Sequence, residues 1–353
     1  MLALSCCCVA VMRGPPSVTA WREAWLRLVQ DGKISSTATL AEKRVRYGLR
    51  LHHQDKAVAA IEEFCIDEES GASLELSDSQ ATIGPYEITL RANRALRPPA
   101  APKLGDLPPH DQELCSMCTG PLRLEIRPMV AQAVVAQTGR CWDVHFNISP
   151  MEPQGHFLLV PEITRAENRR QQRLTRADCE DLVLLGRACA AELCVNFNAA
   201  RAGASQNHIH AHAWAMPKPY PVCGASVLES ATLPSGVLAD ALDWPASVVR
   251  LRGSDAADVG AALEALCSLE IVHNVAVIGE DTFVFVRDPQ GEVSHAVPGL
   301  KLGTIQLLGH MVVDSAEQFA AAAVPGAIEA ALRDTRSATP PRELLTRLAE
   351  RVA

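Results

Sequence analysis

Apolar and polar residues follow each other along this chain in two patterns, one helical and one strand-like. Recurrence of apolar residues every three or four positions predicts helices over residues 19–30, 37–50, 175–197, 256–270, 316–333 and 342–352. Alternating patterns or short apolar runs predict strands at residues 86–91, 142–146, 156–160, 275–286 and 299–313. Helices interleaved with strands in this way predict an α+β fold.

One short stretch places three histidines at alternate positions. It reads Gly203-Ala-Ser-Gln-Asn-His-Ile-His-Ala-His-Ala-Trp214. In a strand, alternate residues share one face, so His208, His210 and His212 would point the same way and Ile209 and Ala211 would pack behind them. On a helix the three rings would scatter around the axis. The spacing therefore predicts a strand that presents a row of histidines to a pocket, in preference to three unrelated core histidines.

Distances along an extended strand separate the roles of these histidines. At about 3.3 Å per residue, His208 and His212 lie about 13 Å apart and cannot easily share one metal ion. Neighbouring members lie only about 6.6 Å apart. One of them can therefore bind a metal while the next faces a substrate.

A second candidate for metal binding is the pair Cys115-Ser-Met-Cys118. Two thiolates at this spacing suit zinc, although a redox pair or two incidental core cysteines would have the same spacing. A tetrahedral site needs two further ligands. His156, at the start of a predicted strand, and His208, at the start of the histidine row, complete a Cys2His2 set.

Composition narrows the class of protein. The chain has 353 residues, 48% of them hydrophobic and 21% charged, which is ordinary for a globular protein with a large core. Its net charge of −8 argues against a general nucleic-acid-binding protein. The twelve cysteines are mostly scattered, and we find no signal peptide and no membrane span. We therefore expect a cytoplasmic protein with free thiols and no membrane partner. The sequence assigns no role to Cys6, Cys7 and Cys8.

Taken in order, these motifs resemble the transferase branch of the histidine-triad superfamily. The resemblance rests on Cys115-x-x-Cys118, on Ile148-Ser-Pro-Met-Glu-Pro-Gln-Gly-His156, on Asn198 and on the row 203–212. That branch contains galactose-1-phosphate uridylyltransferase, diadenosine tetraphosphate phosphorylase and GDP-sugar phosphorylase-like proteins, some known only as ATP adenylyltransferase-like. The resemblance is good over residues 86–214 and continues weakly to residue 310.

The resemblance implies a fold and a domain arrangement. The fold is a histidine-triad-like antiparallel sheet with flanking helices, built as two related half-barrel units. Residues 86–222 would form the catalytic unit with the zinc site. Residues 223–353 would form a second, degenerate unit with the C-terminal helices, and residues 1–85 an N-terminal region of uncertain fold.

The resemblance also implies roles for single residues. Cys115, Cys118, His156 and His208 would bind a structural Zn²⁺, and His210 would be the nucleophile. The implied reaction is a nucleotidyltransferase or phosphorylase reaction on a nucleotide sugar or a dinucleoside polyphosphate. It would run through a covalent nucleotidyl-histidine, with inorganic phosphate or a sugar phosphate as acceptor. Relatives of this kind commonly dimerise, so a homodimer is expected.

Residues near the histidine row are candidates for binding the substrate. They offer amide, hydroxyl or cationic groups to a phosphate chain, and they are Asn198, Arg201, Ser205, Gln206, Asn207, Arg287 and Lys301. Ser205 and Asn207 are equally typical of turns. The arginines between residues 165 and 176 are interpreted as a solvated charge run, with phosphate binding as the alternative.

His212 departs from the transferase pattern, which has glutamine at this position. A glutamine amide binds phosphoryl oxygens without titrating, whereas an imidazole can also donate a proton to a leaving group. A hydrolase of nucleotide phosphoesters or phosphoramidates that uses His212 is therefore the alternative enzyme. A non-catalytic, zinc-stabilised nucleotide-binding protein and an open metal site formed by the three histidines are further alternatives.

Overall fold

The structure is a computed structural model. The structure describes residues 12–32, 35–40, 43–54, 57–74, 78–91, 109–115, 117–119, 129–147, 150–152, 155–190, 192–269, 272–289, 291 and 293–352. Cys6, Cys7 and Cys8 lie outside these residues. None of the helices in the described ranges combines the length and apolarity of a membrane span.

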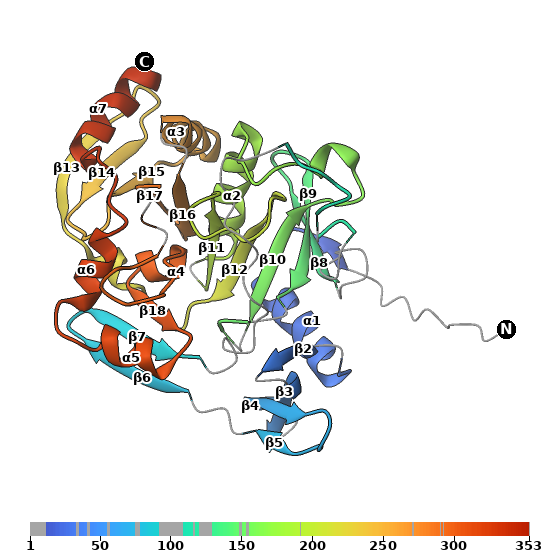
Figure 1. Cartoon of the computed structure of the whole chain (residues 1–353). Helices are drawn as coiled ribbons and strands as arrows, with labels where there is room; N and C mark the ends of the chain where they lie inside the picture. Colours follow the sequence, from blue (N-terminus) through green and yellow to red (C-terminus); the bar gives the residue numbers. More distant parts are fainter. Residues whose placement is uncertain are drawn as a thin grey trace.

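One large sheet runs through the described part of the molecule (Figure 1). Its strands, in chain order, are β1 (Met12–Gly14), β8 (Met129–Val135), β9 (Arg140–Phe146), β10 (His156–Pro161), β11 (Leu193–Asn198), β12 (Ala211–Ala215), β13 (Val227–Thr232), β14 (Leu238–Leu242), β15 (Val248–Arg252), β16 (His273–Ile278) and β17 (Asp281–Val286). The order in space is β1-β8-β9-β10-β12-β11-β16-β17-β15-β14-β13. Apart from the parallel pair β1 and β8, neighbouring strands are antiparallel.

The sheet consists of two units with the same topology. In the first unit the spatial order is β8-β9-β10-β12-β11, and in the second it is β13-β14-β15-β17-β16. Each unit has a helix between its third and fourth strands, α2 (Arg176–Ala188) in the first and α3 (Ala256–Leu269) in the second. The units meet where β11 pairs with β16. This confirms the antiparallel sheet with flanking helices in two related units, and the proposed boundary at residues 222/223 lies between β12 and β13.

The helices α1 (Val18–Gln30), α2, α3 and α7 (Pro341–Val352) share one apolar core with the strands. Trp21 of α1 packs edge-on against Phe157 of β10, with ring centroids 5.8 Å apart. Figure 1 shows α2 and α3 side by side over the junction of the two units. Along β12, Ala211 and Ala213 face this core and Trp214 lies in a second core. Because strand residues alternate, His212 lies on the face opposite the helices.

Smaller elements complete the described chain. A three-stranded sheet contains β6 (Ser79–Ile83), β7 (Tyr86–Leu90) and β18 (His310–Val313), and a four-stranded sheet contains β2 (Ser35–Leu40), β3 (Lys43–Gln54), β4 (Ala57–Asp67) and β5 (Ser73–Leu74). The short helices are α4 (Thr304–Leu307), α5 (Ala316–Ala322) and α6 (Ala327–Arg333), with 3-10 turns η3 (Ala166–Asn168) and η4 (Pro221–Gly224).

Four sequence predictions of secondary structure were wrong in part. Residues 37–50 form β2 and β3 rather than a helix, because Val45, Tyr47 and Leu49 are buried at alternate positions. The helix predicted over 175–197 ends at Ala188, and β11 follows. The strand predicted over 299–313 contains α4 before β18, and the helix predicted over 316–333 is interrupted before Gly326, whose φ is +81°.

Candidate functional site

The histidine row lies on the segment that joins β11 to β12 (residues 199–210) and on β12 itself. His212 is within β12, while His208 and His210 precede the strand in a non-helical segment. Ile209 and Ala211 are fully buried in the core on the helix side. The predicted strand is therefore wrong for His208 and His210, which precede β12, although Ile209 and Ala211 pack against the core as expected. The His210 and His212 rings are neighbours, with centroids 5.2 Å apart.

The His210 ring is held by its own backbone neighbourhood. Its Nδ1 lies 2.7 Å from the carbonyl oxygen of His208. A carbonyl can only accept a hydrogen bond, so Nδ1 carries the proton and the lone pair resides on Nε2. The residue is only 5% exposed. A neutral imidazole with one oriented lone pair is the form that nucleophilic catalysis requires.

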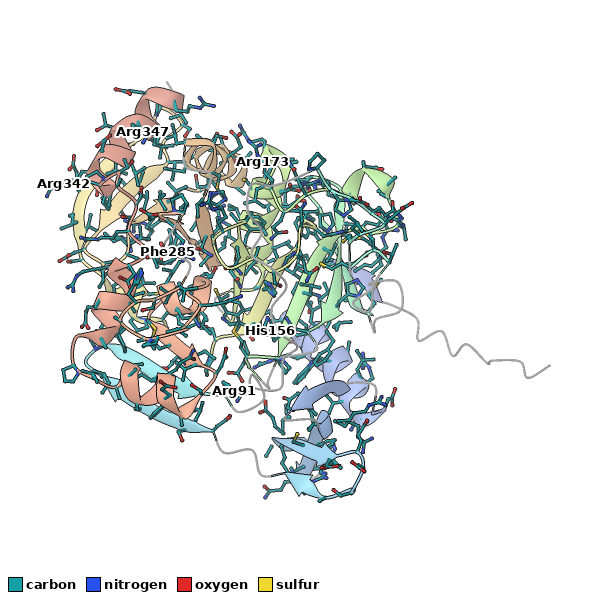
Figure 2. The ribbon with its side chains drawn as sticks, in the orientation of Figure 1. Arg91, His156, Arg173, Phe285, Arg342 and Arg347 are labelled. Carbon is teal, nitrogen blue, oxygen red and sulfur yellow. The ribbon has the colours of Figure 1, made fainter. Side chains whose placement is uncertain are left out.

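His212 is hydrogen-bonded to a second histidine. The backbone N–H of Met151 donates to His156 Nδ1 over 3.0 Å. His156 Nε2 lies 3.2 Å from His212 Nδ1 and 3.3 Å from the amide Nδ2 of Asn147. The His212 ring is thus held through its Nδ1. Figure 2 labels His156 at the start of β10, where this chain of hydrogen bonds begins.

A potential metal site lies next to the first histidine of the row. His110, Cys115, Cys118 and His208 place one ligand atom each within 4.8 Å of one another. His208 Nδ1 is 3.4 Å from Cys118 Sγ and 3.6 Å from Cys115 Sγ. His110 Nε2 is 3.8 Å from Cys118 Sγ. The turn that joins the cysteines is closed by the Cys118 N–H, which donates to the Cys115 carbonyl over 3.1 Å.

The donor set fits a tetrahedral ion. Around zinc, sulfur ligands at about 2.3 Å and nitrogen ligands at about 2.0 Å are separated by about 3.5 Å, which is close to the distances in this cluster. Burial lowers the pKa of His208 to about 3, and burial also lowers the pKa of His110. Both imidazoles are therefore neutral near pH 7, as metal ligation requires.

The fourth member of this cluster differs from the sequence prediction. The structure brings Cys115, Cys118 and His208 together, but His156 is hydrogen-bonded to Met151 and His212 instead. His110 occupies the fourth position. Sequence reasoning overlooked it, although its place five residues before Cys115 was a readable signal.

Two of the predicted substrate-binding residues are structural in this fold. Asn274 donates from Nδ2 to Asn198 Oδ1 over 2.6 Å and accepts at Oδ1 from Arg287 Nη1 over 3.1 Å. Thr304 Oγ1 also donates to Asn198 Oδ1 over 2.7 Å. Arg287 is only 2% exposed. This network connects β11 to β16 and to α4. Asn198 and Arg287 therefore stabilise the end of β11, from which the segment 199–210 with His208 and His210 begins.

The other candidates lie on the loop or at the surface. Arg201, Ser205, Gln206 and Asn207 occupy the loop before His208, which bends back at Arg201, with φ of 61°, and at Gly203, with φ of +100°. Lys301 is exposed and forms an isolated bridge with Val293. The loop residues therefore remain near the histidines.

An open cleft lies on the His156 side of the site. Its lining includes Met151, Trp214, Lys218, Tyr220 and His310. The Trp214 ring stands edge-on to His156, with centroids 5.5 Å apart. The cleft thus approaches His156 by way of Trp214.

No family model matches the chain, and no curated protein matches it by sequence. Its fold is similar to that of yeast Ap4A phosphorylase Apa2. The complex of Apa2 with Ap4A aligns over 91% of this chain and 98% of that chain, with a TM-score of 0.56 and 14% identity. A second Apa2 structure aligns over the same shares, 91% and 98%, with a TM-score of 0.52 and 15% identity. This similarity confirms the fold expected from the resemblance to the transferase branch of the histidine-triad superfamily.

Proposed function

We propose that this chain is a nucleotidyltransferase or phosphorylase that acts on a dinucleoside polyphosphate or a nucleotide sugar. The observation that carries the proposal is the buried His210 ring, whose Nδ1 donates to the His208 carbonyl over 2.7 Å and leaves Nε2 as a nucleophile. The fold supports it, because Apa2, an Ap4A phosphorylase whose structure was determined with Ap4A, has the same architecture.

The reaction runs in two displacements at the α-phosphorus. In the first, the Nε2 lone pair of His210 forms a bond to phosphorus, and the bond from phosphorus to the leaving oxygen breaks. The leaving group departs as a nucleoside triphosphate from Ap4A, or as a sugar phosphate from a nucleotide sugar. In the second, an oxygen of inorganic phosphate or a sugar phosphate attacks the same phosphorus, and the N–P bond breaks.

His212 stabilises the phosphoryl oxygens from the side of the strand. Its Nδ1 lies 3.2 Å from His156 Nε2, and we propose that a proton on its Nε2 is donated to these oxygens as a hydrogen bond. A glutamine amide would present the same kind of donor. His212 therefore performs the role that glutamine has in the transferase pattern, and donors aimed at a developing charge lower the barrier.

The loop before His208 is proposed to hold the phosphate chain. Arg201 supplies a cation, and Ser205, Gln206 and Asn207 supply hydroxyl and amide groups close to the histidines. Ser205 is exposed on the loop, and the other three residues are half-buried. Lys301, at the surface, stays a weaker proposal for contacting the leaving group.

We assign a structural Zn²⁺ to His110, Cys115, Cys118 and His208. With four protein ligands the ion has no open position, so it supplies rigidity and no bound water. Its place beside His208 would anchor the segment two residues before the nucleophile. The chemistry itself belongs to His210 and His212.

Product analysis tests the proposed function. Ap4A is incubated with the protein, with and without inorganic phosphate. Transfer of the AMP moiety to phosphate gives ADP together with ATP, and the reaction requires phosphate. Absence of ADP at any phosphate concentration, and absence of transfer from nucleotide sugars, would contradict the proposal.

Hydrolysis is the second candidate, and the titratable ring of His212 is the observation that favours it. If water were the acceptor, Ap4A would give AMP and ATP in plain buffer. A protonated His212 could then donate to the leaving group. The ratio of ADP to AMP therefore separates the two reactions in one assay.

A further inference from the structure

A buried glutamine side chain holds the backbone of the nucleophile. Gln172 Oε1 accepts from the backbone N–H of His210 over 2.9 Å, and Gln172 Nε2 donates to the carbonyl of His210 over 3.0 Å. The same Nε2 donates to the carbonyl of Asn198 over 2.9 Å. Gln172 is only 1% exposed. Its amide therefore satisfies both backbone groups of His210, as a neighbouring strand would do.

The backbone next to Gln172 continues this pairing. The Ile209 N–H donates to the carbonyl of Arg170 over 2.9 Å, and the Gln172 N–H donates to Asn207 Oδ1 over 3.2 Å. The segment 170–172 thus lies along residues 207–210 and contacts each side of His210.

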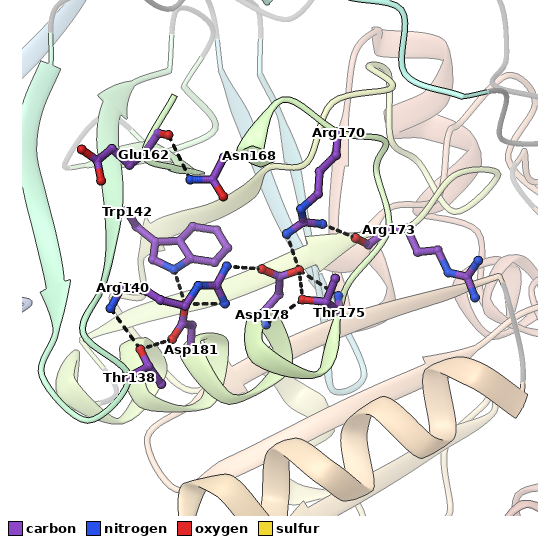
Figure 3. Close-up of polar contacts among 10 residues, drawn as sticks. All are labelled: Thr138, Arg140, Trp142, Glu162, Asn168, Arg170, Arg173, Thr175, Asp178 and Asp181. Carbon is purple, nitrogen blue, oxygen red and sulfur yellow. Dashed lines mark hydrogen bonds and ion pairs between the residues drawn. The ribbon is translucent and has the colours of Figure 1, made fainter. Parts of the chain in front are cut away.

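The segment is itself fixed to the start of α2. Arg170 Nη2 lies 2.5 Å from Asp178 Oδ2, and Arg140 Nη2 lies 2.7 Å from Asp178 Oδ1. Asp178 also closes the capping box with Thr175. Figure 3 shows Arg170 and Arg140 converging on this buried carboxylate from two sides. Arg170, which the sequence placed in a solvated charge run, is therefore part of the support for the histidine segment.

We propose that Gln172 is a positioning residue, which sets the direction of the His210 Nε2 lone pair by holding the His210 backbone. The proposal rests on the proposed function, because it assumes that His210 is the nucleophile. The His210 ring bonds through Nδ1 to the backbone of its own segment at His208, so a shift of that backbone moves the attacking atom with it. A misplacement of about 1 Å can cost about 100-fold in rate.

We call the hydrogen bonds from Gln172 to the His210 N–H, the His210 carbonyl and the Asn198 carbonyl the Gln172 clamp. Glutamine is required because this clamp needs a donor and an acceptor on one side chain. In Gln172→Met the length is kept and both polar functions are lost. In Gln172→Glu the acceptor is kept, but an ionised carboxylate faces the carbonyl oxygens of His210 and Asn198 and has no proton to donate. Gln171→Met is the matched control, since Gln171 is half-buried in the same loop and its side chain makes none of these bonds.

The test measures kcat and KM for Ap4A with phosphate, together with metal content and the rate of nucleotidylation of His210. We expect Gln172→Met to lower kcat by about 10- to 100-fold, with KM within about twofold and metal content unchanged. Gln171→Met should match the wild type. A rise in KM, or a fall in metal content, that accounts for the whole loss would overturn the positioning role.

Gln172→Glu adds a readout that a purely structural role would not move. Burial between two carbonyl oxygens raises the pKa of the new carboxyl, and its protonated form regains a donor. The kcat of Gln172→Glu should therefore rise as the pH falls, on a limb that the wild-type profile lacks. A loss independent of pH would count against the clamp.

The two possible failures can be told apart. If the wild type forms no adduct on His210, the proposed function fails. If the wild type forms the adduct and both Gln172 variants form it at the wild-type rate, only the positioning role fails.

Discussion

The roles that we propose for His210 and His212 follow from what holds each ring. His210 donates from Nδ1 to the His208 carbonyl, while His212 Nδ1 lies 3.2 Å from His156 Nε2. In the proposed mechanism one ring acts as the nucleophile and its neighbour as a hydrogen-bond donor. A nucleophile and an oxyanion-type donor side by side are what phosphoryl displacement needs.

Substitution at His212 distinguishes a neutral donor from a proton donor. We expect His212→Gln to keep phosphate-dependent transfer within about tenfold, because the amide supplies a donor that does not titrate. His212→Leu should lose about 100- to 1000-fold in kcat, as removal of an oxyanion donor does. Steady-state assays of both variants check this. Loss of all transfer in His212→Gln would show that His212 must donate a proton.

The ligand set of the metal site is testable one residue at a time. We expect His110→Ala and Cys115→Ser to lower bound zinc well below the wild-type content, because each removes one of the four ligands. His156→Ala should keep its zinc, since His156 is bonded to Met151 and His212. Elemental analysis of the purified variants measures this. Zinc retained in His110→Ala and lost in His156→Ala would restore the set predicted from the sequence.

Those parts of the candidate site that consist of residues close together in the sequence could be predicted. The Cys115 and Cys118 pair and the alternation of His208, His210 and His212 are local patterns. His110, five residues before Cys115, was within the same reach but was not recognised among the 11 histidines. Gln172 carries no local signal, because its role depends on a loop that packs against residues far along the chain.

At the scale of elements, α2 anchors the site through its first turn. The sequence predicted a helix that starts at residue 175, and the structure shows a capping box between Thr175 and Asp178 at its start. The ion pairs of Asp178 with Arg140 and Arg170 could not be predicted, because they join β9 and a loop to the helix. The early end of this helix follows from Ala190, whose φ of 49° turns the chain into β11.

Asp178→Asn tests this anchor. Removing one partner of a buried ion pair costs about 3 to 5 kcal/mol, and we expect a loss of about 3 kcal/mol in the free energy of unfolding at pH 7. Chemical denaturation measures it. A change below about 0.5 kcal/mol would contradict the anchoring role.

The effect of Asp178 should depend on pH with a defined sign. Burial raises the pKa of Asp178, but the charge of Arg170 and hydrogen bonds from Arg140 and Thr175 outweigh it, so the pKa lies below its ordinary value. A carboxyl with a lowered folded-state pKa stabilises the fold above its unfolded pKa of about 3.9 and loses this as the pH falls through the folded value. The difference between wild type and Asp178→Asn should therefore shrink below about pH 4.

At the scale of the molecule, the histidine row lies in one of two units with the same topology. β17 occupies in the second unit the place that β12 has in the first. Phe283, Val284 and Phe285 of β17 are fully buried, and no histidine lies in that strand. The second unit therefore supports the first by extending its sheet. The pairing of β11 with β16 was not readable in the sequence, because the two strands are far apart along the chain and both are almost fully buried, so no alternation of exposed and buried residues marks a face.

Gly186→Ala tests the packing at the junction of the two units. A Cβ at Gly186 would lie 2.2 Å from Cγ1 of Val277, so α2 would be pushed away from β16. We expect a loss of about 1 to 3 kcal/mol in the free energy of unfolding, which exceeds the helix-propensity gain of about 1 kcal/mol. Gly224→Ala is the control, since a Cβ there meets nothing within 4 Å. Equal stability of the two variants would contradict the tight junction.

The most direct test of the account is intact-mass analysis after incubation with Ap4A in the absence of phosphate. We expect one added AMP moiety per active chain, located on His210 by peptide mapping and discharged as ADP when phosphate is added. His210→Ala should form no adduct. An adduct that persists in His210→Ala, or turnover of the wild type with no adduct on the pathway, would contradict the central claim.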